Sequence, residues 1–346
     1  MSDFMASHKL ERWPHQKDHQ CVIKPFVFES GETLPELKVA FTTLGQAAQN
    51  DSGDIVNAVL LLHSTWGNRG IWLTPSLANE LFAKDKPLDA SRYFIILPDA
   101  IGHGRSSRPS EGLKAAFPRY GCRDQVRAQH ILVTQALRIS RLRLVLGVSL
   151  GGWFTWMWGT MYPEMMDRLV PIGVEPFGLA GRNWIIRRMI IDSIRNDPRW
   201  AGGHYEVNPS PHISTIPLLI LMAQGVASLQ RLVPTRQAAD TYYRRLVTEQ
   251  LGKIDANDLL YALECGLDYD PSADLDRIKA RVLAVNFADD ELIPVEVNRT
   301  SDVVDRLPQS RCVMVPESQQ SQGHLTYFKG HTWAWALADF LSDKSQ

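Results

Sequence analysis

A serine flanked by glycines is the strongest chemical signal in the sequence. Residues 144–152 read Leu-Val-Leu-Gly-Val-Ser-Leu-Gly-Gly, an apolar run that leads into Gly-x-Ser-x-Gly, and the helix-like residues 153–162 follow. A strand, a sharp turn and a helix are the context in which this motif presents a nucleophile. The turn places the hydroxyl at a helix N-terminus, where free N–H groups favour a developing negative charge. We therefore predict that Ser149 attacks a carbonyl carbon; an inert serine in a glycine-rich turn is the alternative.

A serine hydroxyl needs a base, which is usually a histidine held by a carboxylate. The histidines after Ser149 are His204, His212, His324 and His331. The first two lie in a segment rich in helix and proline, and His331 is expected in the last helix. His324 instead lies in a loop after the apolar run 312–315. A loop beyond the carboxyl end of a late strand can reach the nucleophile, so we assign His324 as the base.

Three adjacent acids, residues 289–291, follow the apolar run 282–287. They lie between the serine and the histidine, where the acid falls in the chain order serine, acid, histidine. A recurrent turn, Asp-x-Leu-[Ile/Phe]-Pro, places this acid four positions before a proline. Because the proline here is Pro294, Asp290 is the predicted partner of His324. Asp289 is the alternative, and otherwise it is expected to be a solvated turn residue.

These residues need strands and helices to position them. Short apolar and β-branched runs predict strands at 21–28, 37–43, 58–62, 93–97, 142–146, 169–173, 282–287 and 312–315. Helix-length segments such as 124–137 separate many of them. This alternation predicts an α/β fold with a mostly parallel sheet and helices on both faces. The first two runs lie close together, which is compatible with an antiparallel edge.

The pattern becomes helical and irregular between about residues 175 and 281. Helices are predicted at 184–196, 216–229, 235–251 and 256–265, with prolines between them. So much helix between two strands predicts a helical lid at residues 176–276, inserted into a core domain of residues 1–175 and 277–346. An extra helical layer without a gating role is the alternative.

The composition excludes several classes of function. Apolar residues make up 45% of the chain, charged residues 22%, and the net charge is −1, so nothing favours nucleic acid or an acidic membrane. No apolar run is long enough to span a membrane, and the first twenty residues do not resemble a secretory signal. The histidines in that stretch lack a spaced acidic or cysteine partner. We therefore expect a cytoplasmic protein without metal or cofactor, and reduced thiols at Cys21, Cys122, Cys265 and Cys312.

The sequence resembles the homoserine O-acetyltransferase-like branch of the α/β-hydrolase superfamily. Motifs over most of the chain carry this resemblance: residues 31–35, 39–45, 57–63, 147–152, 162–163, 196–205, 290–292 and 323–324. The segment 196–205, Asn-Asp-Pro-Arg-Trp-Ala-Gly-Gly-His-Tyr, is specific, because unrelated hydrolases do not carry it. The resemblance implies the α/β-hydrolase fold, a helical lid over a deep site and an acyl-enzyme on Ser149. Members often pair through lid helices, so a homodimer is compatible with it.

The resemblance also implies where the oxyanion binds, and the position of nearby aromatic residues indicates where the acyl group binds. The backbone N–H groups of Leu150 and Thr65 are the expected oxyanion donors. Trp66 and Trp153 are candidates for the substrate site, with core packing as the alternative. His63 is expected to be a packing residue at a strand end, with a direct chemical role as the alternative. Asp99 and His103, in a recurrent turn after residues 93–97, are expected to be structural, and family lid arginines would correspond to Arg187 or Arg188.

Two departures from the transferases decide the predicted reaction. Leu325 follows His324 where the transferases carry an Asp that is associated with the amino group of the acceptor. Residues 104–109, Gly-Arg-Ser-Ser-Arg-Pro, are closer to general esterases than to the Gly-Ser-Thr-Gly-Pro-like turn of the transferases. We therefore predict a serine hydrolase that acts on a carboxylic ester or a related acyl substrate. The alternative is an acyl-CoA-dependent O-acyltransferase, and a binding protein on a relict fold is disfavoured because such relatives commonly lose a triad member.

Overall fold

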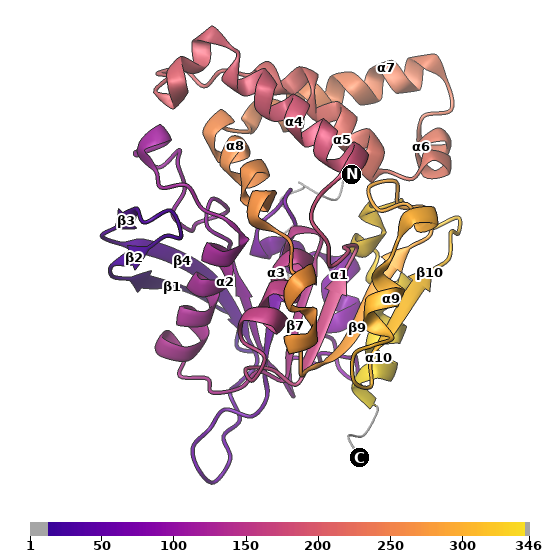
Figure 1. Cartoon of the computed structure of the whole chain (residues 1–346). Coiled ribbons are helices and arrows are strands. Elements are labelled where there is room, and N and C mark those ends of the chain that lie inside the picture. Colours follow the sequence, from indigo (N-terminus) through magenta and orange to yellow (C-terminus); the bar gives the residue numbers. More distant parts are fainter. Residues whose placement is uncertain (1–12, 343–346) are drawn as a thin grey trace.

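The computed structural model describes residues 13–342, and one sheet of eight strands organises them (Figure 1). The strands lie in the order β1 (Lys17–Ile23), β4 (Leu37–Leu44), β6 (Phe94–Pro98), β5 (Ala58–Leu62), β7 (Leu144–Val148), β8 (Arg168–Ile172), β9 (Arg281–Phe287) and β10 (Arg311–Val315). β1 pairs antiparallel with β4, and β4 with β6, whereas the other neighbours are parallel. The predicted mostly parallel sheet and its antiparallel edge are confirmed. Two short strands, β2 (Phe26–Val27) and β3 (Thr33–Leu34), form a separate hairpin.

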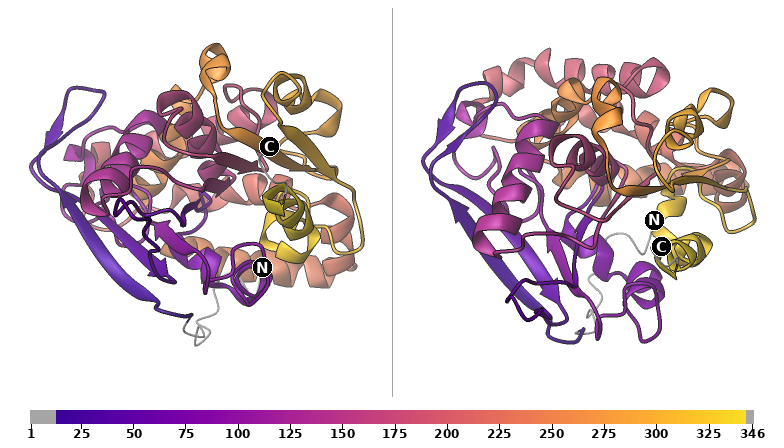
Figure 2. Two further views of the ribbon diagram at one scale, coloured as in Figure 1. Left: turned by 90° about the horizontal axis from the view of Figure 1, so that it is seen from below. Right: turned by 60° about the horizontal axis from the view of Figure 1, so that its bottom comes forward.

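Helices cover both faces of this sheet, as Figure 2 shows. Every residue of β5 and β7 is buried, which is typical of parallel strands covered on both sides. Successive side chains alternate between faces: Leu60 and Leu62 pack in one apolar cluster with α2 (Cys122–Ile131) and α3 (Leu150–Met161). Val59 and Leu61 pack in the other, with α1 (Pro75–Leu81) and α10 (Ala334–Ser342). The short α9 (Thr300–Val304) lies between β9 and β10.

The chain between β8 and β9, residues 173–280, is called the insertion below. It contains α4 (Gly181–Arg195), α5 (Ile216–Ala223), α6 (Val226–Leu232), α7 (Arg236–Arg245) and α8 (Ala256–Glu264). These helices share an apolar cluster of their own, against which Trp66 and Leu292 of the core also pack. Both residues follow the carboxyl ends of strands, so the insertion lies over that end of the sheet, at the top of Figure 1.

One predicted helix of the insertion is broken. The apolar run 216–229 forms two helices, α5 and α6, because the chain leaves the helix at Gln224 and Gly225. A Cβ on Gly225 would collide with the Asp289 carboxylate and the backbone of Gly323. The contact joins segments far apart in the chain, so apolar periodicity cannot reveal it. Within the described residues, no helix has the length and apolarity needed to cross a membrane.

Candidate active site

Ser149 occupies the sharp turn between β7 and α3. Its φ of 53° and ψ of −117° lie outside the helix and strand regions, a conformation that costs energy and recurs at functional sites. Two glycines make the turn sterically feasible. A Cβ on Gly147 would collide with the Gly151 carbonyl, and a Cβ on Gly151 with the Leu62 carbonyl. The motif therefore holds the serine at the first turn of α3, tight against the end of β5.

Three side chains from separate loops meet at this turn. Ser149 Oγ lies 2.9 Å from His324 Nε2, and His324 Nδ1 lies 2.6 Å from Asp290 Oδ2. His324 is 5% exposed and Asp290 2%. The other oxygen of Asp290 accepts hydrogen bonds from the backbone N–H groups of Leu292, at 2.8 Å, and Ile293, at 3.3 Å. The carboxylate is thus fixed by its own loop and faces the ring nitrogen remote from the serine.

Asp289 lies beside this arrangement without touching the histidine ring. Its Oδ2 accepts a hydrogen bond of 2.7 Å from the backbone N–H of Gly323, and partial burial raises the pKa of its carboxyl group. The expectation of a solvated turn residue is wrong, because this carboxylate connects the loop after β9 to the loop that contains His324. The geometry is that of the predicted register, in which Asp290 faces His324.

The two expected oxyanion donors have free N–H groups. Within the described residues, neither Leu150 N–H nor Thr65 N–H donates a hydrogen bond. Leu150 begins α3, where the first N–H groups of a helix have no partner within it. Thr65 is buried in the loop after β5, and Gly151 packs against that end of the strand. The loop and the helix start are therefore close neighbours with unused donors.

The candidate substrate residues divide between two cavities that share no lining residue. The nucleophile cavity, of about 510 Å³, is lined by Ser149, His324, Trp153 and Arg187, among others. The oxyanion-loop cavity, of about 350 Å³, is lined by Thr65, Trp66 and Leu325 together with Ile220, Leu259 and Ala262 of the insertion. Trp153 thus lies on one side and Trp66 and Leu325 on the other.

Arg187, rather than Arg188, is the lid arginine that reaches the site. Its side chain is buried, its Nε donates to Asn183 at 2.9 Å, and its guanidinium lies 5.1 Å from the ring centre of Trp153. Its Nη1 has no hydrogen-bond partner among the described residues, and burial lowers the pKa of the guanidinium to about 10. Arg188 instead pairs with Asp192 at the surface, 2.8 Å away. A helical stripe through positions 187, 190, 191 and 194 of α4 is the signal that singles out Arg187.

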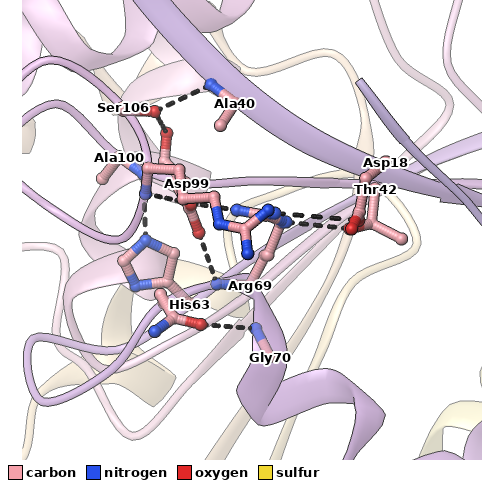
Figure 3. Close-up of polar contacts among 11 residues, drawn as sticks. Asp18, Ala40, Thr42, His63, Arg69, Gly70, Asp99, Ala100 and Ser106 are labelled. Atoms are coloured by element: carbon pink, nitrogen blue, oxygen red, sulfur yellow. Dashed lines mark hydrogen bonds and ion pairs between the residues drawn. The ribbon is translucent and has the colours of Figure 1, made fainter. Parts of the chain in front are cut away.

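A buried polar network lies behind the loop after β5 (Figure 3). Arg69 forms an ion pair with Asp99 and donates from its Nε to Thr42 at 2.8 Å. The backbone N–H groups of Arg69 and Arg105 also donate to the Asp99 carboxylate, each at 2.8 Å. Ser106 Oγ donates to the Asp99 carbonyl at 2.8 Å. These contacts are those of a structural aspartate, as expected, and they join the loops after β5 and β6.

No group of three or more His, Cys, Asp or Glu side chains in residues 13–342 has the arrangement of a metal site. Of the histidines near the start of the chain, His8 lies outside the described residues. His19 packs against Phe41 and contacts Thr43 at 3.0 Å. His15 contacts Gln46 at 3.4 Å.

Comparison of the sequence with known proteins identifies the family of the chain. Residues 57–328 match the family model described as alpha/beta hydrolase fold. A homoserine O-acetyltransferase of Chlorobaculum parvum is 35% identical over 199 residues, which are 54% of this chain and 52% of that protein, so the match spans about half of the relative. A homoserine O-acetyltransferase of Chlorobaculum tepidum is 30% identical over 255 residues, 68% of each chain.

The solved structure of the acetyl esterase MekB has the same fold. It matches with a TM-score of 0.79 at 23% identity and covers 94% of this chain and 97% of that one. Proteins named for transfer and for hydrolysis thus share this architecture, so the fold alone does not select between the two reactions. The sequence match and the shared architecture confirm the resemblance: the chain is an enzyme of the α/β-hydrolase superfamily and belongs to its homoserine O-acetyltransferase-like branch.

Proposed function

We propose that the protein forms an acyl-enzyme on Ser149 and hydrolyses a carboxylic ester or a related acyl substrate. The observation that carries the proposal is the hydrogen-bonded series Ser149–His324–Asp290, with distances of 2.9 and 2.6 Å. With the Nδ1 proton directed at Asp290, Nε2 is free to accept the proton of the serine hydroxyl. The imidazolium that forms is stabilised by the adjacent carboxylate.

Acylation then follows the usual order of bonds. Ser149 Oγ bonds to the carbonyl carbon while its proton passes to His324 Nε2. The carbonyl oxygen becomes negative, and we assign the N–H groups of Leu150 and Thr65 to stabilise it, because neither has an acceptor in the described part of the chain. His324 returns the proton to the leaving oxygen as the carbon–oxygen bond breaks. Water repeats the sequence on the acyl-enzyme and releases the acid.

The choice of water as the acyl acceptor rests on the oxyanion-loop cavity. Leu325 offers no hydrogen bond and no charge to the ammonium group of an amino-acid acceptor. The acids that line the same cavity are already engaged: Asp255 caps α8 and accepts from Tyr205, and Asp258 accepts two hydrogen bonds from Ser110. In that cavity, a buried ammonium without a dedicated carboxylate costs several kcal/mol, which opposes binding of such an acceptor there.

The second candidate is O-acyl transfer from an acyl-CoA to an alcohol such as homoserine. It uses the same acyl-enzyme, and the names of the relatives favour it, since both relatives described above are homoserine O-acetyltransferases. The two candidates differ only in what attacks the acyl-enzyme. A transferase must hold its acceptor in place and exclude water from the site.

Product analysis tests the choice. Purified protein is given a short-chain acyl ester or acyl-CoA, with and without millimolar homoserine, and free acid and O-acylhomoserine are quantified over time. We expect free acid as the main product and no acceleration by homoserine. Faster formation of O-acylhomoserine would replace the hydrolase by the transferase. The variant Ser149→Ala is the control and should form neither product.

We also propose that residues 176–276 act as a lid on a core domain of residues 1–175 and 277–346, and that two chains pair through lid helices. Exposed apolar side chains on α4 and α5 support the pairing: Ile185, Met189, Leu218 and Leu221. Light scattering should give twice the mass of one chain, and the double variant Ile185→Glu, Leu221→Glu should give a monomer. A wild-type monomer would refute the pairing.

A further inference from the structure

The loop after β5 contains a buried histidine that is not part of the triad. His63 directly precedes Ser64 and Thr65 and is 2% exposed. We infer that His63 is a positioning residue that orients the backbone N–H of Thr65 toward the oxyanion. The inference rests on the acyl chemistry proposed above, because it assigns a task to a donor of that reaction.

Both ring nitrogens of His63 have backbone partners. His63 Nε2 lies 2.9 Å from the backbone nitrogen of Ala100, and Nδ1 lies 2.8 Å from the Ser64 carbonyl oxygen. Figure 3 shows the first of these contacts, beside the Arg69–Asp99 pair. An N–H group can only donate, so Nε2 must be the acceptor. The ring proton is therefore on Nδ1, which donates to the Ser64 carbonyl.

This bond fixes one particular peptide plane. The Ser64 carbonyl and the Thr65 N–H belong to the same peptide group, which is planar and trans, so the two point in opposite directions. A hydrogen bond that holds the Ser64 carbonyl against the imidazole therefore turns the Thr65 N–H away from it. That N–H has no acceptor among the described residues, as a group reserved for a reaction intermediate requires. Loss of the bond would let the plane rotate.

The next peptide group is held in a similar way. His103 Nε2 lies 3.2 Å from the Thr65 carbonyl oxygen, and the rings of His63 and His103 are 5.1 Å apart. Ala100, the partner of His63, directly follows Asp99, whose carboxylate is bound to Arg69. Consecutive peptide planes of the loop thus depend on contacts with the turn after β6. Preorganised donors of this kind do not have to reorient during the reaction.

The side-chain amides of Asn and Gln separate the two hydrogen bonds of His63. The amide of Asn reaches the place of imidazole Nδ1, so His63→Asn retains a donor for the Ser64 carbonyl. The amide of Gln reaches the place of Nε2, so His63→Gln retains an acceptor for Ala100 N–H and loses the donor. If His63 only packs, both variants should impair the protein equally.

The experiment measures the acylation burst with a p-nitrophenyl ester, together with kcat, KM, thermal stability and inhibition by a trifluoromethyl ketone. Loss of one oxyanion donor costs about 10²–10³ in rate. We expect His63→Gln to lose about that factor in acylation rate and in trifluoromethyl ketone affinity, with KM little changed. We expect His63→Asn to recover at least about a tenfold part of the loss at the same thermal stability.

Equal losses in the two variants, or a wild-type burst rate in His63→Gln, would overturn the inference while the proposed function stands. If the wild type gives no burst and Ser149 is not acylated, the proposed function fails and the inference fails with it. Nitrogen NMR of wild-type His63 gives an independent test that needs no variant. We expect a proton on Nδ1 only, and a proton on Nε2 would contradict the inference.

Discussion

The two sides of Ser149 are built differently. On the core side, the buried charged and histidine side chains behind the loop after β5 are paired, as in the ion pair of Arg69 with Asp99 and the two backbone contacts of His63. On the insertion side, Arg187 keeps an Nη1 without a partner in the described part of the chain, and it lines the nucleophile cavity. The charged groups of the core side are therefore held by protein partners before any substrate arrives, whereas Arg187 retains hydrogen-bonding capacity. We therefore expect the core to determine the reaction and the insertion to determine which substrates react.

The largest expected effect concerns the nucleophile. We expect Ser149→Ala to reduce kcat by about 10⁶-fold, because removal of a triad nucleophile leaves only binding and the oxyanion hole. The fold should survive, since alanine is smaller than serine. A serine-directed fluorophosphonate should label the wild type at Ser149 and leave the variant unlabelled. Residual activity near the wild-type level would place the chemistry elsewhere.

The two neighbouring acids should differ strongly. Asp290→Asn should lower kcat by about 10⁴-fold, because the amide stabilises the wrong histidine tautomer. Asp289→Asn should have a much smaller effect, since an amide oxygen can still accept from Gly323 N–H. Steady-state kinetics of the matched pair gives the answer. The reverse order would show that Asp289 is the triad acid.

Removal of one partner of the ion pair between Arg69 and Asp99 should strongly destabilise the protein. Arg69→Met leaves the buried Asp99 carboxylate without its cation, which should lower the free energy of unfolding by about 3–5 kcal/mol. Urea denaturation of Arg69→Met against the exposed control Arg105→Met measures it. A loss below about 1 kcal/mol would mean that the pair is dispensable, as for an ordinary surface ion pair.

Two buried histidines, one on each side, predict acid sensitivity. Burial lowers the pKa of both His63 and His212 from 6.5 to about 4. Between those values the unfolded chain binds a proton that the folded chain does not, so stability falls as the pH falls from 6.5 to 4. Each histidine contributes roughly 3 kcal/mol at most. Urea titrations across that range should show a shallower decline for His212→Gln, and an unchanged slope would refute the neutral buried state of His212.

The smallest expected effect has the opposite sign. Arg187 is a buried charge that has no acidic partner among residues 13–342. Replacement of such a charge by an apolar side chain is often stabilising, so Arg187→Met should raise the free energy of unfolding by about 1 kcal/mol. Arg188→Met, on the surface of the same helix, should change it by less than about 0.5 kcal/mol. Thermal denaturation of the two variants measures the difference. A strong destabilisation by Arg187→Met would mean that its contacts with Asn183 and Trp153 outweigh its burial.

Local sequence was sufficient for the parts of the site that local rules govern. Three signals act within a few residues: the apolar run before Ser149, the glycines of its turn and the sequence spacing from Asp290 to Pro294. The contacts of His324 with Ser149 and Asp290 agree with what these signals predict. The strand runs also predicted the sheet, because parallel strands buried on both faces are continuously apolar.

What the sequence could not reveal depends on contacts between distant segments. Three features depend on segments that are distant in the sequence and meet only in the folded chain. They are the contact of Asp289 with Gly323, the backbone partners of His63 and the break between α5 and α6 at Gly225. Burial of Arg187 lies between these cases. The apolar stripe of α4 is visible in the sequence. An arginine on such a stripe is nevertheless expected to be exposed, because charged residues are seldom buried.

The contact between Gly225 and Gly323 limits how far the insertion is an exchangeable module. A Cβ on either glycine would collide with the backbone of the other, so the two segments meet without side chains between them. Gly323 directly precedes His324. A chimera that takes its insertion from another member of the superfamily must therefore match a third junction besides the ends of β8 and β9. Where that junction carries a side chain, we expect the graft to displace His324, the proposed base, so that a change intended to alter specificity would lower turnover instead.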